Sequence, residues 1–167
     1  PEKSKEFIEQ IHAKSNNMTV AMDDMLWSID PNNDNMRYFI SRFREYTDAL
    51  KNRNDVQIDL LVDKKVEALQ LNMKLRKDIF WLFKGGITNV IKSGGVNNKI
   101  HISYDKPVLI YTLEFDTSKM DMDQLNNLRL RKELSDKLDD LGAWLDFKEH
   151  SMTAVFVLKI PIRKDGY

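Results

Sequence analysis

The stretch that decides the fold is LRKDIFWLFKGGITNVIKSGG, residues Leu75–Gly95. Its apolar residues return every three or four positions, as they do along one side of an α-helix. The apolar side is wide, so we predict a helix over residues 72–93 that lies centrally against a sheet. The closing pair Gly94-Gly95 ends this helix, because glycine adopts the backbone conformations of a helix C-terminus without steric cost.

On both sides of this helix, helical and alternating apolar patterns follow one another. They predict two further helices, over residues 35–53 and 124–141, and strands at residues 56–62, 100–102, 108–115, 144–148 and 153–160. Asp105-Lys106-Pro107 and Glu149–Met152 supply the turns between neighbouring strands. The order is helix, strand, helix, strand, strand, helix, strand, strand. It predicts an α+β sandwich in which helices cover one face of a mixed sheet.

The first 29 residues carry a heptad seam with one polar member. Its positions are spaced alternately three and four apart, at Ile8, Ile11, Ser15, Met18, Met22, Met25 and Ile29. A seam this narrow requires another helix against it, so it predicts a coiled coil or helix bundle that dimerises the chain. The alternative is a helix that packs on its own domain.

The segment Asp30-Pro31-Asn32-Asn33-Asp34 separates this helix from the rest of the chain. Proline disfavours a helical residue before it, and asparagine and aspartate favour turns and helix caps. We therefore predict two parts: a dimerisation helix in residues 1–31 and a second domain in residues 32–167.

Composition narrows the class of protein. The chain has 167 residues, of which 42% are hydrophobic, with 26 basic residues against 26 acidic ones and no cysteine. The balanced charge argues against a nucleic-acid partner, and the absence of cysteine excludes disulfides and thiol catalysis. No apolar run approaches the roughly 20 residues that cross a bilayer, and the first residues do not resemble a signal peptide. We expect a cytoplasmic chain, with any sensor or membrane region upstream.

Four stretches resemble one family of signalling proteins. The element order is similar to that of the Bergerat (GHKL) ATPase fold. Met22–Asp34, MDDMLWSIDPNND, resembles the segment that joins the dimerisation helices to the ATPase domain in sensor histidine kinases of the LytS/DesK-like group. Leu75–Lys84 resembles the lead-in to that family's asparagine box, and Leu141–Leu145 and Leu158–Ile162 resemble its closing helix and final strand.

This resemblance covers almost the whole chain. It implies the C-terminal part of a two-component sensor, which forms a homodimer and passes its signal to a response regulator. In the family, ATP and Mg²⁺ are the cofactors of a protein histidine kinase.

The residues at the family's asparagine box depart from its pattern. The box runs from a glutamate to an asparagine and then to a lysine, and here Gly85 stands where the glutamate is expected. The family's glutamate acts near the transferred phosphate as a base or proton-network partner, so its loss argues against phosphotransfer. Asn89 keeps the place of the amide that binds magnesium, and Lys92 keeps a basic residue that can face phosphates.

Both glycine boxes are also altered. In the first, Asp116 or Phe115 takes the place of the family's adenine-binding aspartate, and neither glycine of the box is present. In the second, residues 122–128 contain no glycine, and about eight residues separate Phe115 from the next helix, which leaves little room for a lid. Asp121 and Asp123 near this helix start would repel a polyphosphate.

The histidines do not supply the family's phosphoacceptor. His12 is followed by Ala13 rather than by an acidic residue, and it lies one residue off the heptad seam. His101 alternates away from its apolar neighbours, and His150 lies in a hairpin. The three show no spacing typical of metal ligands, so we predict neither a catalytic residue nor a metal site.

Three functions remain open at this point. The first is a two-component signalling module whose ATPase domain has lost or weakened ATP binding and phosphotransfer, that is, a pseudokinase without a resident cofactor. The second is an active histidine kinase with an unorthodox site made of Asn89, Lys92 and Asp116. The third is a scaffold or anti-sigma-like domain that binds a partner and no nucleotide.

Overall fold

A computed structural model describes residues 2–11, 36–129 and 132–163. Residues 2–11 form a helix whose side chains are exposed, including the apolar side chains of Phe7, Ile8 and Ile11. The rest of the heptad seam, the segment 30–34 and His12 lie outside the described residues. The predicted boundary between residues 31 and 32 therefore stays a prediction.

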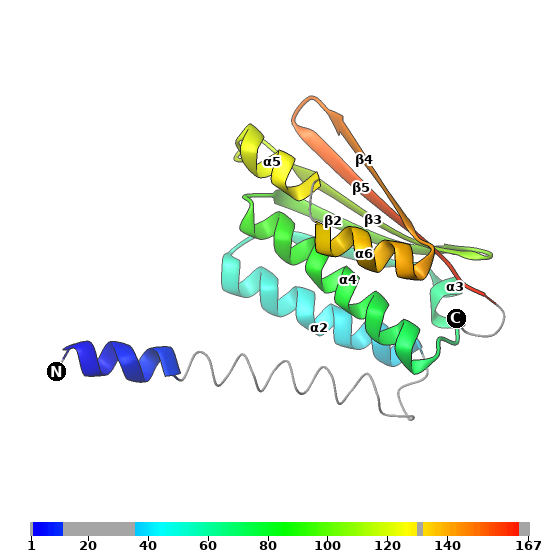
Figure 1. Ribbon diagram of the computed structural model, residues 1–167, viewed down its shortest axis with the longest axis horizontal. Coiled ribbons are helices and arrows are strands. Elements are labelled where there is room, and N and C mark those ends of the chain that lie inside the picture. Colours follow the sequence, from blue (N-terminus) through cyan, green and yellow to red (C-terminus); the bar gives the residue numbers. More distant parts are fainter. Residues whose placement is uncertain (1, 12–35, 130–131, 164–167) are drawn as a thin grey trace.

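The remaining elements form an α+β sandwich, as predicted. In chain order they are α2 (Met36–Asn54), β1 (Ile58–Val62), α3 (Lys64–Glu67), α4 (Met73–Lys92), β2 (Val96–Asp105), β3 (Val108–Asp116), α5 (Met122–Arg129), α6 (Lys132–Leu141), β4 (Trp144–His150) and β5 (Thr153–Pro161). The five strands form one sheet in the order β1-β2-β3-β5-β4, in which only β1 and β2 run parallel. Figure 1 shows α2, α4 and α6 together on one side of this sheet.

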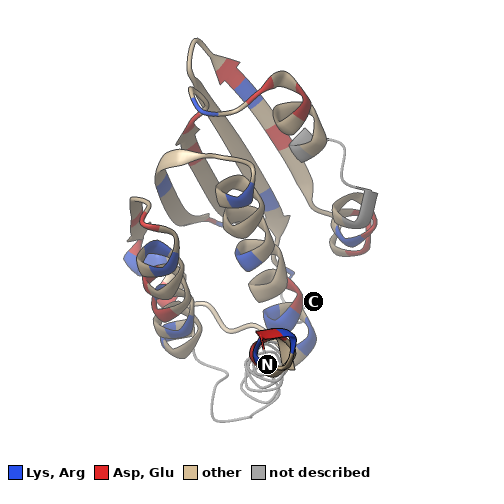
Figure 2. Ribbon diagram, turned by 90° about the vertical axis from the view of Figure 1, so that its left-hand side faces the viewer, with Lys and Arg blue, Asp and Glu red and all other residues tan. Residues whose placement is uncertain are grey.

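Alternating burial explains why one face of the sheet takes the helices. In β3 and β5 every second residue is buried, and the residues between them are half-buried on the other face. Because buried residues recur at every second position of a strand, alternating apolar residues in the sequence predict these strands. Figure 2 shows both acidic and basic residues on the helices, with mainly basic ones on α4.

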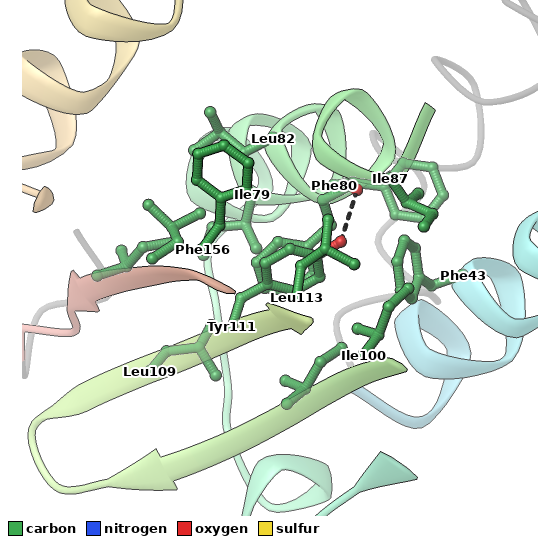
Figure 3. Packing of buried hydrophobic residues seen from close by; sticks show 14 of the residues in the cluster. Phe43, Ile79, Phe80, Leu82, Ile87, Ile100, Leu109, Tyr111, Leu113 and Phe156 are labelled. Carbon is green, nitrogen blue, oxygen red and sulfur yellow. Dashed lines mark hydrogen bonds between the residues drawn. The ribbon is translucent and has the colours of Figure 1, made fainter. Parts of the chain in front are cut away.

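The helix α4 lies at the centre of the core, as its wide apolar side predicts. Phe83 is fully buried, with its ring stacked on that of Tyr111 at a centroid distance of 4.3 Å. Phe39 and Phe43 of α2 meet Phe83 edge-on, each at 5.8 Å between centroids. Figure 3 shows Phe43 and Tyr111 of this cluster between α2, α4 and β3. The Tyr111 hydroxyl donates a hydrogen bond to the carbonyl oxygen of Phe83 at 3.2 Å.

Both ends of α4 are fixed by neighbouring residues. At its start, the side-chain oxygen of Asn72 accepts a hydrogen bond from the amide of Leu75 at 2.8 Å, which is a helix N-cap. At its end, Gly94 takes a φ of +98°, a conformation that glycine adopts without the strain of a Cβ. Gly95 is buried, and a Cβ there would lie 2.4 Å from Cγ1 of Val90. The last turn of α4 therefore has no space for a side chain at residue 95.

One detail of the predicted element order differs from the structure. The short helix α3 was not predicted, because four residues are too few to display a helical period. Within residues 124–141, where one helix was predicted, the structure describes α5 and α6, and residues 130–131 between them lie outside the described residues.

Candidate functional site

Two adjoining cavities lie against the second half of α4. The outer cavity has a volume of about 340 Å³ and lies between α2, α4 and α6. The α4 residues from Trp81 to Asn89 form most of its wall, with Tyr46 from α2 and Leu134 from α6. The inner cavity has about 50 Å³ and shares Leu82, Gly86, Asn89 and Leu134 with the outer one. The two cavities therefore adjoin each other along these four residues.

The inner cavity is lined almost entirely by apolar side chains. Its far walls come from three strands, with Tyr111 and Leu113 of β3, Leu145 of β4, and Phe156 and Leu158 of β5. Gly86 lines both cavities, and a Cβ there would lie 3.6 Å from Cε1 of Tyr111.

Lys84 brings a positive charge to the outer cavity. Its Nζ lies 4.8 Å from the ring centroid of Tyr46 and 5.5 Å from that of Phe80, so two aromatic faces hold the ammonium. The hydroxyl of Tyr46 is hydrogen-bonded to the hydroxyl of Thr88, which fixes the ring under the ammonium. Lys84 is the only charged side chain among the described residues that line either cavity.

Of the three residues predicted to bind a nucleotide, Asn89 is the one among the lining residues of the two cavities. Asn89 is half-buried and lines both cavities. Lys92, one turn later, is exposed, and neither it nor Asp116 is among the residues that line the cavities.

Asp116 is engaged in its own turn at the end of β3. Its carboxylate accepts a hydrogen bond from the amide of Ser118 at 2.7 Å. This bond, with further help from the Ser118 and Asn97 side chains and from Lys119, holds the pKa of Asp116 below its ordinary value. The contact is that of an Asx turn, a local arrangement that needs no ligand.

The start of α5 is occupied by side chains of the chain itself. The Asp121 carboxylate accepts from the amide of Gln124 at 2.7 Å, and the Gln124 side-chain oxygen accepts from the amide of Asp121 at 3.1 Å. This reciprocal pair is a capping box, with aspartate in the role of serine or threonine. The helix end that binds phosphate in many proteins already has an acidic cap here.

The connection between β3 and α5 is short and packed. It runs from Thr117 to Asp121, and the amide of Thr117 donates to the carbonyl oxygen of Met152 at 2.7 Å. The carbonyl oxygen of Lys119 would lie 3.2 Å from a Cβ at Gly94, which shows how closely this connection approaches the end of α4. The prediction that little room remains for a lid agrees with this packing.

One ion pair attaches α6 to α4 beside the cavities. Lys137 Nζ lies 3.1 Å from Oδ1 of Asp78, whose side chain is only 12% exposed. The same ammonium lies 5.9 Å from the ring centroid of Trp81, at the rim of the outer cavity. Since Leu134 lies one turn before Lys137, this contact holds the cavity-lining part of α6 against α4.

The described histidines lie away from the cavities. His101 is on the side of β2 that faces away from the helices, as its alternation predicts, with Nε2 3.0 Å from Oδ1 of Asp63. His150 is exposed at the end of β4. Within residues 2–11, 36–129 and 132–163, no group of three or more His, Cys, Asp or Glu side chains could hold a metal ion. Of the helices that the structure describes, none has the length and apolar character to cross a membrane.

Sequence reasoning identified Asn89 but missed Lys84 and Tyr46. Their contact joins residues 38 positions apart on two helices, so no spacing in the sequence indicates it. The available signal was the pair Gly85-Gly86 within an otherwise strong helical pattern. Each glycine inside a helix costs about 1 kcal/mol relative to alanine, so such a pair suggests a place where the helix leaves space beside it.

Comparison with known proteins was informative only at the level of structure. No family model and no curated protein sequence matches the chain. The catalytic domain of histidine kinase ThkA in its nucleotide-free form is similar, with a TM-score of 0.56, 15% identity, and coverage of 76% of this chain and 92% of that one. The Acinetobacter baumannii histidine kinase AdeS has a TM-score of 0.60 at 10% identity, with coverage of 94% and 84%.

A third similar structure is that of ThkA in complex with the response regulator protein TrrA. It gives a TM-score of 0.56 at 14% identity, with coverage of 91% of this chain and 50% of that one. The chain therefore has the fold of histidine kinase catalytic domains, which confirms the predicted architecture. At these identities the likeness concerns the fold.

Proposed function

We propose that the chain is the C-terminal signalling part of a two-component sensor related to the LytS/DesK-like group, in which the ATPase-type domain has lost most of its ATP binding and phosphotransfer. The fold shared with histidine kinase catalytic domains supports the signalling role. The main support for the loss of activity comes from the cavity beside Asn89. Its described lining residues include one cation and no carboxylate.

Among the described residues that line the cavity, none supplies the base of a phosphoryl transfer. Gly85, at the place of the family's glutamate, lines the outer cavity, and a Cβ added there would have no other atom within 4 Å. No side chain at this position can accept a proton or order a reacting group. Catalysis of phosphoryl transfer depends mostly on positioning the phosphates and on stabilising their charge. Lys84 alone can position a triphosphate only weakly and can neutralise little of its charge.

The neighbouring loops also do not fit a nucleotide. The amides at the start of α5 are capped by Asp121, whose negative charge favours the helix dipole and repels phosphates. Asp116 holds Ser118 rather than facing the cavity lining. The residues present therefore do not fit ATP and Mg²⁺, and we derive no reaction step through them.

Calorimetric titration with ATP and Mg²⁺ is expected to show no saturable binding at physiological, millimolar nucleotide. The reason is that a single ammonium cannot balance a triphosphate after its hydration is lost. The matched variant is Asn89→Ala, which removes the one family residue that lines both cavities. Saturable, magnesium-dependent heat that disappears in Asn89→Ala would favour the rival function, an active kinase that uses Asn89, Lys92 and Asp116.

The dimer and the response regulator belong to the same proposal. ThkA, one of the similar structures, is in complex with the response regulator TrrA, which supports a partner of this class for our chain. The heptad seam supports a homodimer, and the exposed Ile8 and Ile11 are the seam positions that the structure describes. In this role the domain transmits a change in helix packing by docking, without a phosphotransfer step of its own.

Replacing Met18 and Met25 by aspartate is expected to convert a dimer of this chain into a monomer. At each of the two positions, the aspartates of the two chains would face each other in the buried seam. Like charges without partners there destabilise a coiled coil. Sedimentation or light scattering measures the association state. The control is Gln10→Asp with Asn17→Asp, which adds the same charge one heptad apart but off the seam, and it should leave the dimer intact. If the variant with both seam substitutions remained a dimer, the prediction that the chain dimerises through this seam would be wrong.

A further inference from the structure

The strand β4 has one edge that no described strand covers. It lies at the end of the sheet and pairs with β5 alone among the described strands (Figure 1). The edge of a sheet presents a row of backbone N–H and C=O groups that can pair with a further strand. All residues of β4 pair with β5 without a register shift, so the strand is regular over its full length of 7 residues.

Two opposite charges lie on the face of β4 that points away from the helices. Phe147 packs against the core, whereas Asp146 and Lys148 on either side of it are exposed. Their partners in the register with β5 are Val157 and Val155, which cannot balance a charge. Within the described part of the chain, neither Asp146 nor Lys148 forms an ion pair. Both charges are therefore available to a strand that approaches the open edge.

The order of residues in β4 is complementary to itself. In an antiparallel pair of β4 with its copy, centred on Phe147, Asp146 of each chain lies opposite Lys148 of the other. Trp144 lies opposite His150 at both ends of the pair. Directly opposite residues have Cβ atoms about 4.5–5.5 Å apart, and opposite charges at this distance stabilise an antiparallel pair.

Neighbouring registers place like charges opposite each other. If the helices of both copies lie on the same side of the joined sheet, the register changes by two residues at a time, because one residue would turn every side chain to the other face. A change in one direction puts Asp146 opposite its own copy, and a change in the other direction does the same for Lys148. Like charges directly opposite are destabilising. Charges on an edge strand usually prevent pairing, whereas those of β4 disfavour only the wrong registers.

We propose that β4 pairs antiparallel with β4 of a second copy, in the register centred on Phe147, and joins the two sheets into one. Such a contact is isologous, since the same residues contribute from both sides. A single strand edge is smaller than the roughly 1,000 Å² of a stable interface, so we expect weak association that appears at high protein concentration. The contact is separate from the heptad seam and does not depend on whether the domain binds ATP.

Disulfide trapping is the first test, because the chain has no cysteine of its own. Full-length chains with Asp146→Cys and with Lys148→Cys are unfolded, mixed, refolded and oxidised with diamide. Opposite residues have Cα atoms about 4.5–5.5 Å apart, within the range of about 4.4–6.8 Å that disulfides span. In each chain with itself, the equivalent positions are offset by two residues, about 7 Å along the strands, beyond this range. Mass spectrometry identifies which chains are joined.

The control is the same experiment on β1, the other edge strand of the sheet. Asp59→Cys and Leu61→Cys are also two residues apart and exposed. We expect the mixed disulfide on β4 to form at least about tenfold faster than the one on β1, because pairing holds the two thiols together. Equal rates on the two strands, or a mixed pair on β4 no faster than each chain with itself, would overturn the inference.

Charge reversal tests the register independently. The starting chain has Met18→Asp and Met25→Asp, so that the heptad seam does not contribute, and sedimentation at high protein concentration measures the association. Asp146→Lys alone, or Lys148→Asp alone, puts like charges opposite each other and should abolish the dimer. Both reversals together restore opposite charges and should restore it. Asp48→Lys, the same change at an exposed position of α2, should leave the dimer intact.

The outcomes separate this inference from the proposed function. If the doubly reversed chain associated no better than the two single reversals, the pairing of β4 would be refuted, and the ATP titration would still decide the proposed function. Saturable ATP binding would refute the proposed loss of activity and leave the pairing of β4 as it is. A circular dichroism spectrum like that of the parent chain shows that each variant is folded.

Discussion

Replacing Phe83 by alanine is expected to lower the free energy of unfolding by about 3–5 kcal/mol, the range for large aromatic side chains in cores. Phe83 is fully buried at the centre of α4 and contacts the rings of Phe39, Phe43 and Tyr111. Alanine would remove these contacts and leave a void that three rigid rings cannot easily fill. Urea denaturation followed by circular dichroism measures the loss.

The control for this prediction is Trp81→Ala on the same helix. Trp81 is a larger side chain, but it is 48% exposed at the rim of the outer cavity. Its removal should therefore cost clearly less than the removal of Phe83. If the two variants lost equal stability, the burial of the side chain would not explain the effect, and the central place of Phe83 in the core would be refuted.

Replacing Gly95 by alanine is expected to destabilise the protein by about 1–3 kcal/mol, the usual cost of overpacking. The added Cβ would lie 2.4 Å from Cγ1 of Val90, 3.0 Å from the Val90 carbonyl oxygen and 3.2 Å from Cε of Met120. The Val90 carbonyl belongs to the last turn of α4 and accepts from the amide of Gly95 at 2.9 Å, so it cannot move without loss of that bond. Thermal unfolding measures the effect as a lowered Tm.

Replacing Gly85 by alanine should stabilise the protein, the opposite of the effect at Gly95. A Cβ there meets no other atom within 4 Å, and alanine favours a helix interior over glycine by about 0.5–1 kcal/mol. Gly85→Ala should therefore raise the Tm slightly. A pair of variants that shift the Tm in the same direction would contradict the packing described for the end of α4.

Sequence reasoning predicted the parts of the fold that depend on local periodicity. The helix predicted over residues 72–93 is α4, Met73–Lys92, since a wide apolar stripe has few other interpretations. Alternation predicted β3 and β5 to within one residue at their ends. The helix α3 was not predicted, because a helix of four residues depends on what packs beside it rather than on its own period.

The candidate site was less predictable than the fold. The capping box of Asp121 and Gln124 was present in the sequence as an acidic residue followed three positions later by glutamine, a recognised helix start. The contact of Lys84 with Tyr46 was not, because it depends on how α2 and α4 pack. The cavities could not be predicted either, because their walls come from three helices, α2, α4 and α6, and from the sheet, which meet only in the folded chain.

The buried hydroxyl of Tyr111 makes the stability of this domain fall in strongly basic solution. Burial, with a smaller contribution from Tyr46, raises the pKa of Tyr111 well above its ordinary value of 10.0. Above that pH an unfolded chain releases this proton while the native protein keeps it, so each further rise in pH favours the unfolded chain. The Tyr111 ring, which packs β3 against the centre of α4, is therefore also a group through which high pH destabilises the core.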